Sequence, residues 1–201
     1  MRILLALSLL FISSVSVAAQ RADKISWAHG GKNFDGYLVW DDASKKARPG
    51  LLMVPNWYGV NESAIKKAKT IAGKDYVVML VDMYGSDVRP KNAVEAGKAA
   101  GGVYADPAEL RARITKALAQ LKSVGKKAPV DSQNIGAIGF CFGGAVALDL
   151  ARSGADIAGI ASFHGNLSSK LPASKAGDVE ASVLVMNGAD DTYVSAEAIT
   201  S

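Results

Sequence analysis

The residues best suited to chemistry stand in one short segment, Gly139-Phe140-Cys141-Phe142-Gly143. An apolar run precedes this segment and a helix-forming run follows it, so it fits the nucleophile elbow G-x-S-x-G with cysteine in place of serine. Gly139 and Gly143 would let the strand and the helix cross closely, and a helix N-terminus favours a thiolate. The alternative is a small cysteine buried in a glycine-rich packing contact. The strand–turn–helix setting favours Cys141 as a nucleophile.

An acid to accompany this thiol follows a later apolar run. Asp190 and Asp191 come directly after the predicted strand Ser182–Met186, on a turn that begins Asn187-Gly188. In proteins with this elbow, the catalytic triad runs nucleophile, acid, histidine along the chain. We therefore expect Asp191 to be the triad acid, with Asp190 in reserve. The alternative is that an aspartate only stabilises the turn through its side chain.

The general base is harder to place, because the chain has only two histidines. His29 lies near an N-terminal hairpin, where we expect a surface or packing role. His164 ends the predicted strand Ile157–Phe163 at the catalytic edge of the sheet, but it precedes Asp191, against the usual order. We expect His164 to line the pocket or fix a loop, and to be a base only in reserve. The expected histidine loop and last strand would then lie beyond Ser201, leaving an unpaired sheet edge.

Backbone N–H groups near the thiol are candidates for an oxyanion hole. One donor is expected to be the N–H of Phe142, directly after the nucleophile. The other is expected in the loop after the predicted strand Gly50–Val54, at Asn56 or Trp57. The alternative for the aromatic residues of this loop is that they cover the edge of the sheet.

The elements that must position these residues are strands alternating with helices. This order predicts an α/β fold, with a mostly parallel sheet and helices on both faces. Asp106 followed by Pro107 predicts a capped helix start. The predicted elements are a hairpin (Ile25–His29 and Phe34–Trp40, turning at 30–33), strands Gly50–Val54, Tyr76–Val81, Asn134–Phe140, Ile157–Phe163 and Ser182–Met186, and helices over Asn61–Lys74, from Pro107 to Gly125, after Cys141 to Arg152, and beginning at Ser195.

The N-terminus predicts a secretory signal peptide. Arg2 precedes an apolar run, and small residues end at Ala19, where cleavage is expected; the alternative is an uncleaved anchor. Residues 20–201 are then a single domain, periplasmic or secreted, with no membrane contact after cleavage. Hydrophobic residues make up 49% and charged residues 21% of the chain, and the net charge is only +4. That balance excludes wholesale disorder and gives no basis for nucleic-acid binding.

The chain from about Ile25 to Ser201 resembles the dienelactone hydrolase family of α/β-hydrolases. The motifs that carry the resemblance are Tyr58-Gly59-Val60-Asn61, Val81-Asp82-Met83-Tyr84-Gly85, the Cys141 elbow and Gly188-Ala189-Asp190-Asp191. The resemblance implies a Cys-His-Asp triad that hydrolyses esters or lactones through an acyl-thioester. It implies Cys141 as nucleophile, Asp191 as acid, and Trp57 and Phe142 as oxyanion donors. No metal or cofactor is expected.

The sequence departs from the family pattern in the substrate pocket. The family's type enzyme has a glutamate that helps to activate the thiol, where this chain has Asn56, whose amide cannot accept the proton. Ser86 stands about where the type enzyme has an arginine for the substrate carboxylate, with Arg89 as a substitute nearby. We expect Asn56, Tyr58, Tyr84 and Arg89 to line the pocket. The alternative function is a catalytically silent α/β-hydrolase-fold protein that binds a small apolar ligand.

Overall fold

The computed structural model describes residues 20–200, apart from 174, 176 and 192. The predicted signal peptide lies outside these residues. The strands are β1 (Gln20–His29), β2 (Lys32–Asp41), β3 (Arg48–Val54), β4 (Val77–Leu80), β5 (Val130–Phe140), β6 (Gly159–Phe163) and β7 (Ser182–Met186). The helices are α1 (Glu62–Ala72), α2 (Ala93–Tyr104), α3 (Pro107–Lys122), α4 (Phe142–Arg152) and α5 (Ala196–Thr200), with a 3₁₀ turn η1 (Gly125–Lys127).

The strands form one sheet in the order β1-β2-β4-β3-β5-β6-β7. β1 and β2 pair antiparallel, and β2 meets β4 antiparallel, whereas β4, β3, β5, β6 and β7 run parallel. The carboxyl ends of the parallel strands therefore meet at one edge, to which Cys141, His164 and the turn after β7 all belong. The sheet is the mostly parallel one that the alternation of elements predicts.

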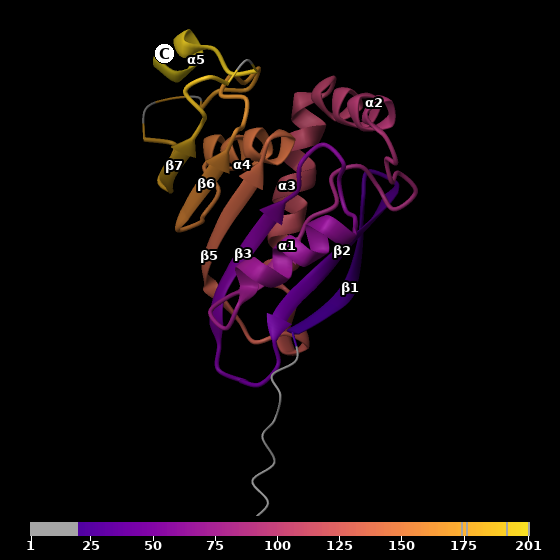
Figure 1. The fold of residues 1–201 in the computed structure, drawn as a ribbon. Helices are drawn as coiled ribbons and strands as arrows, with labels where there is room; N and C mark the ends of the chain where they lie inside the picture. The colour runs from indigo at the N-terminus through magenta and orange to yellow at the C-terminus, as the bar shows by residue number, and fades with distance from the viewer. Residues whose placement is uncertain (1–19, 174, 176, 192, 201) are drawn as a thin grey trace, which may run out of the picture.

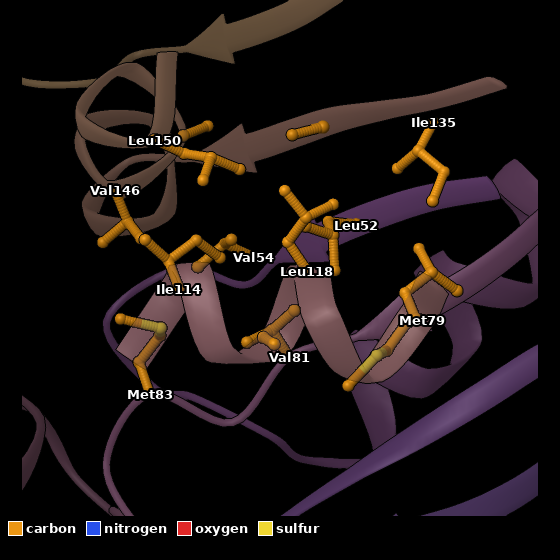
Figure 2. Close-up of a cluster of buried hydrophobic side chains, with 14 of the residues drawn as sticks. Leu52, Val54, Met79, Val81, Met83, Ile114, Leu118, Ile135, Val146 and Leu150 are labelled. Carbon is orange, nitrogen blue, oxygen red and sulfur yellow. The ribbon is translucent and has the colours of Figure 1, made fainter. Parts of the chain in front are cut away.

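Helices cover both faces of this sheet (Figure 1). α1 packs on one face, where Ala64, Ala68 and Ala72 share an apolar cluster with strand residues. α3 and α4 pack on the other face, and their apolar side chains meet those of β3, β4 and β5. Figure 2 shows this larger cluster, which includes Leu52, Val54, Met79, Val81, Ile114, Leu118, Ile135, Val146 and Leu150. α4 thus packs directly on β5 and β6, the strands that lead to Cys141 and His164, whereas β7 at the edge of the sheet is largely exposed.

Cap residues explain where the main helices begin. Asp106 accepts the N–H of Glu109 and precedes Pro107, as its sequence predicts, and Asn61 caps α1 by accepting the N–H of Ala64. α1 is shorter than expected, beginning at Glu62 and ending at Ala72. In the described part of the chain, no helix combines the length and apolar character that crossing a membrane requires.

Besides shifts in the bounds of several elements, a turn and a helix differ from the sequence prediction. The hairpin turn is tighter, because Gly30 and Gly31 alone form it at positive φ and Lys32 already belongs to β2. Helix α2 is not among the predicted elements; its buried Ala96, Ala100 and Val103 have helical spacing, but three glycines lower its helix propensity. Asn92 nevertheless accepts the N–H of Glu95 and caps it. This helix contributes two side chains to the site described next.

Candidate active site

Cys141 occupies a strained turn between β5 and α4. Its φ is 54° and its ψ is −114°, a backbone conformation that residues other than glycine adopt rarely. The close crossing around it depends on glycine. A Cβ on Gly139 would lie 1.9 Å from the carbonyl oxygen of Gly143, and a Cβ on Gly143 would lie 2.2 Å from the carbonyl oxygen of Val54. The elbow geometry that the spacing predicts is therefore present.

The half-buried thiol of Cys141 opens on a cavity of about 360 Å³. The cavity is lined by Trp57, Ala100, Tyr104, Cys141, Phe142, His164 and Tyr193. The ring of Phe142 packs between two tyrosine rings, with centroids 5.3 Å from Tyr84 and 5.2 Å from Tyr104. The thiol therefore faces a mainly aromatic space at the carboxyl edge of the sheet.

An imidazole and a carboxylate meet at the same edge. The Nδ1 atom of His164 contacts the Oδ2 atom of Asp191. A tautomer with its proton on Nδ1 donates to this carboxylate and leaves Nε2 basic. The backbone N–H of His164 donates to the carbonyl of Met186 over 2.8 Å, which ties β6 to β7 at this point. The reserve acid, Asp190, lies exposed in the same turn.

The electrostatics keep Asp191 ionised. Desolvation raises the pKa of the Asp191 carboxyl, but hydrogen bonds from the backbone N–H of Tyr193 and from His164 outweigh it. The pKa therefore lies below its ordinary value of 3.8. The Tyr193 N–H donates to Oδ1 over 2.8 Å, while Oδ2 faces the imidazole. An ionised carboxylate in this position can fix the tautomer of an imidazole and stabilise its protonated form.

The predicted oxyanion loop is held by hydrogen bonds that leave one donor unused. The hydroxyl of Tyr84 donates to the carbonyl of Trp57 over 2.8 Å. The N–H groups of Tyr58 and Gly59 donate to the side chain and the carbonyl of Asn56. None of these contacts uses the N–H of Trp57. The N–H of Phe142 is that of the first residue of α4, so it has no acceptor within the helix.

Four residues expected in the pocket lie elsewhere. Asn56 and Tyr58 line a separate cavity of about 150 Å³, and the Asn56 side chain is engaged with its own loop. Tyr84 and Arg89 line another cavity of about 510 Å³. Tyr84 nevertheless lies beside the Cys141 cavity, because its ring packs against Phe142 and its hydroxyl donates to the Trp57 carbonyl. The described lining of the Cys141 cavity thus includes Trp57 and Phe142 but none of these four residues.

Arg89 is held by structural contacts. Its guanidinium donates to the buried carboxylate of Asp82 and to the carbonyls of Asp35, Gly85 and Val88. Asp82 also accepts the N–H groups of Asp35, Tyr84 and Gly85. The aspartate of the Asp-x-Tyr segment therefore has a structural role, because its hydrogen bonds organise the loop that positions Tyr84.

Sequence reasoning missed three residues that line the cavity: Ala100, Tyr104 and Tyr193. The first two lie on α2, which had not been predicted. Tyr193 lies two residues after Asp191, where it packs edge-on against His164 with ring centroids 5.9 Å apart. The sequence offers one indication of its role, which is that an aromatic residue stands close to the predicted acid. Among the described residues, no group of three or more His, Cys, Asp and Glu is placed to hold a metal ion.

Comparison with known proteins places this geometry in a family. A model of the dienelactone hydrolase family matches residues 34–201. A solved structure named m3DLH is 35% identical, with a TM-score of 0.82, and the match covers 90% of this chain and 74% of that one. A dienelactone hydrolase-like promiscuous phosphotriesterase from metagenomic libraries is also 35% identical over the same shares, with a TM-score of 0.79.

A curated relative is matched over a shorter stretch. An uncharacterized protein of Caenorhabditis elegans is 48% identical over 60 residues, which are 29% of this chain. The match spans only 36% of the length of that protein. The family model and the solved structures nevertheless cover most of this chain. The chain belongs to the dienelactone hydrolase family and has its α/β-hydrolase fold.

Proposed function

We propose that this protein hydrolyses esters or lactones through a covalent acyl-thioester on Cys141. The observation that carries the proposal is the thiol itself, held at a φ of 54° at the start of α4 and opening on the same cavity as His164. Strain of this kind persists where the surrounding structure enforces it, and it is concentrated at functional sites. Membership of a hydrolase family supports the same reaction class.

The reaction divides into two steps. An imidazole held by Asp191 takes the proton of Cys141, and the thiolate attacks the carbonyl carbon of the ester. The N–H groups of Trp57 and Phe142 stabilise the oxyanion, and the alcohol leaves with the proton from the imidazolium. Water then attacks the thioester, the C–S bond breaks, the acid leaves and the thiol regains its proton.

The candidate base among the described residues is His164, which contacts Asp191. His164→Gln tests this assignment: loss of nearly all activity assigns the base to His164, and a loss below about tenfold shows that another group takes the proton.

The test of the nucleophile is the hydrolysis of 4-nitrophenyl acetate by the full natural chain and by Cys141→Ala. We expect kcat/KM to fall by about 10³-fold or more, because the covalent route is lost. A rapid acid quench of the wild type should trap one acetyl group on the peptide that contains Cys141. Gly101→Ala, on an exposed face of α2 with open space around the added methyl, is the control and should retain activity.

An equal rate in Cys141→Ala would overturn the proposal. An inactive wild type whose thiol also resists iodoacetamide at neutral pH would favour the silent binding protein, because an activated thiol reacts quickly.

Phosphotriester hydrolysis is a second candidate. The metagenomic relative is described as a promiscuous phosphotriesterase. A phosphotriester has no net charge, and no lysine or arginine is among the described residues that line the Cys141 cavity. The same pair of proteins, assayed with a 4-nitrophenyl dialkyl phosphate, tests whether Cys141 also attacks phosphorus.

A further inference from the structure

The described lining of the Cys141 cavity offers a substrate no cationic side chain. Four of its seven residues are aromatic, one is alanine, and the other two are Cys141 and His164. The ring of Trp57 lies against α2, where a Cβ on Gly97 would be 3.7 Å from its Cζ3 atom. Ala100 and Tyr104 extend the same wall from that helix. The space is shaped for an apolar group, whose burial is favourable.

Arginines of the neighbouring elements are committed to other partners. Arg89 binds Asp82 and three carbonyls, and it lines a different cavity. Arg113 donates to Glu109 over 2.8 Å and to the carbonyl of Met83 over 2.9 Å. Arg111 donates to Asp149 and to the carbonyl of Leu171. Releasing any of these to meet a substrate carboxylate would break a charge-assisted hydrogen bond to a carboxylate and one or more to carbonyls.

The site also carries negative charge of its own. Asp191 is ionised, so Asp191, the imidazole it holds and Cys141 together carry one net negative charge, whether the proton lies on the thiol or on the imidazole. Burial and the nearby Cys141 raise the pKa of Tyr104, so this lining hydroxyl stays protonated and adds no charge of either sign. A substrate anion would thus lose water in an aromatic space, beside a site of net negative charge and with no lysine or arginine among the described lining residues. Such burial is strongly unfavourable.

From these contacts we infer that the Cys141 cavity selects uncharged aromatic or apolar esters and discriminates against substrates that carry a free carboxylate. The inference rests on the proposed hydrolase function and adds the substrate class. Ala100, Tyr104 and Trp57 would contact the apolar group. The exposed Tyr193, at the rim, would be the position where a cation could reverse the preference.

The test compares two esters that differ in one charge, 3-acetoxybenzoate and its methyl ester, with the full natural chain. We expect kcat/KM for the methyl ester to exceed that for the anion by about tenfold or more. Equal values, or a preference for the anion, would overturn the inference while leaving the hydrolase function in place. If neither ester is hydrolysed in a manner that depends on Cys141, the proposed function itself fails.

A variant with an added positive charge tests whether the preference for the uncharged ester arises at the Cys141 cavity. Tyr193→Lys places an ammonium at the rim, where the tyrosine is 86% exposed, so the fold should tolerate it. We expect the preference for the methyl ester to shrink by about fivefold. Val94→Lys is the matched control, since Val94 is 83% exposed on α2 and outside the cavity lining, and it should leave the preference unchanged. An equal shift in both variants, or none in Tyr193→Lys, would contradict the assignment to this cavity.

Discussion

At the scale of single residues, the role of Asp191 as the triad acid can be tested against Asp190, the aspartate next to it. Asp191 contacts His164 and accepts the N–H of Tyr193, whereas Asp190 is exposed in the same turn. Asp191→Asn removes the charge that fixes an imidazole tautomer, so we expect kcat/KM to fall by about 10²- to 10⁴-fold. The measurement is ester hydrolysis near pH 7.

Asp190→Asn is the matched control, and its kcat/KM should stay within about twofold of the wild type, as expected of a surface substitution. If Asp190→Asn caused the larger loss, the acid would be the residue held in reserve.

The sequence was informative about residues whose role depends on local geometry. Cys141 follows from a strand–turn–helix pattern that one short segment contains, and Asp191 follows from its place after an apolar strand. Asn56 and Tyr58 were expected in the pocket, but they line another cavity, whereas Trp57 between them lines the Cys141 cavity. The hydrogen bond from Tyr84 to the Trp57 carbonyl, 27 positions away, helps to fix the loop, and a sequence does not reveal such a contact.

At the scale of elements, the crossing of β5, α4 and β3 depends on glycines that have no room for a methyl group. We expect Gly143→Ala to destabilise the fold by about 3 kcal/mol or more, because its Cβ would overlap the carbonyls of Val54 and Pro55. The measurement is the free energy of unfolding in urea.

Gly101→Ala is the control inside a helix, because nothing lies within 4 Å of the added methyl. It should stabilise the protein by about 0.5 to 1 kcal/mol through helix propensity. Equal effects of the two substitutions would show that the elbow does not need its close approach.

Strands and helices were predictable where the residue types of a segment reflect its burial or its capping. The β-strands of the centre read as apolar runs because helices cover them on both faces. α3 was predictable because Asp106, Pro107 and Glu109 form its start. α2 was not, because Gly97, Gly101 and Gly102 lower its helix propensity and its buried face consists mostly of small alanines. Ala100 and Tyr104 lie on that helix, so their place in the cavity wall could not be predicted either.

At the scale of the whole molecule, Glu109 joins the N-terminal hairpin to α3. It accepts a hydrogen bond from Arg113 and contacts His29, the last residue of β1. The Arg113 guanidinium is the main cause that lowers the pKa of Glu109, desolvation opposes it, and His29 adds to the lowering. A carboxylate whose pKa is depressed by folding stabilises the protein above its ordinary pKa of 4.5 and ceases to do so as the pH falls below it.

We therefore expect Glu109→Gln to reduce the free energy of unfolding by about 1 kcal/mol at pH 7. The difference from the wild type should shrink as the pH falls from about 4.5 toward 3. Urea unfolding across this range measures it. Asp75→Asn, at an exposed carboxylate with no side-chain hydrogen bond in the described part of the chain, is the control. A difference that stays constant with pH would show that the charge of Glu109 contributes nothing.

The placement of the three tryptophans gives the molecule an optical property. Trp27 and Trp40 are buried in the core at 6% and 4% exposure, whereas Trp57 is 36% exposed in the wall of the Cys141 cavity. A molecule that enters the cavity changes the surroundings of Trp57 and leaves those of the other two unaltered. Intrinsic fluorescence, and its quenching by a small solute such as acrylamide, should therefore report occupancy without a label. Trp57 is therefore an intrinsic fluorescent probe of the cavity, and it should also report compounds that bind but are not hydrolysed.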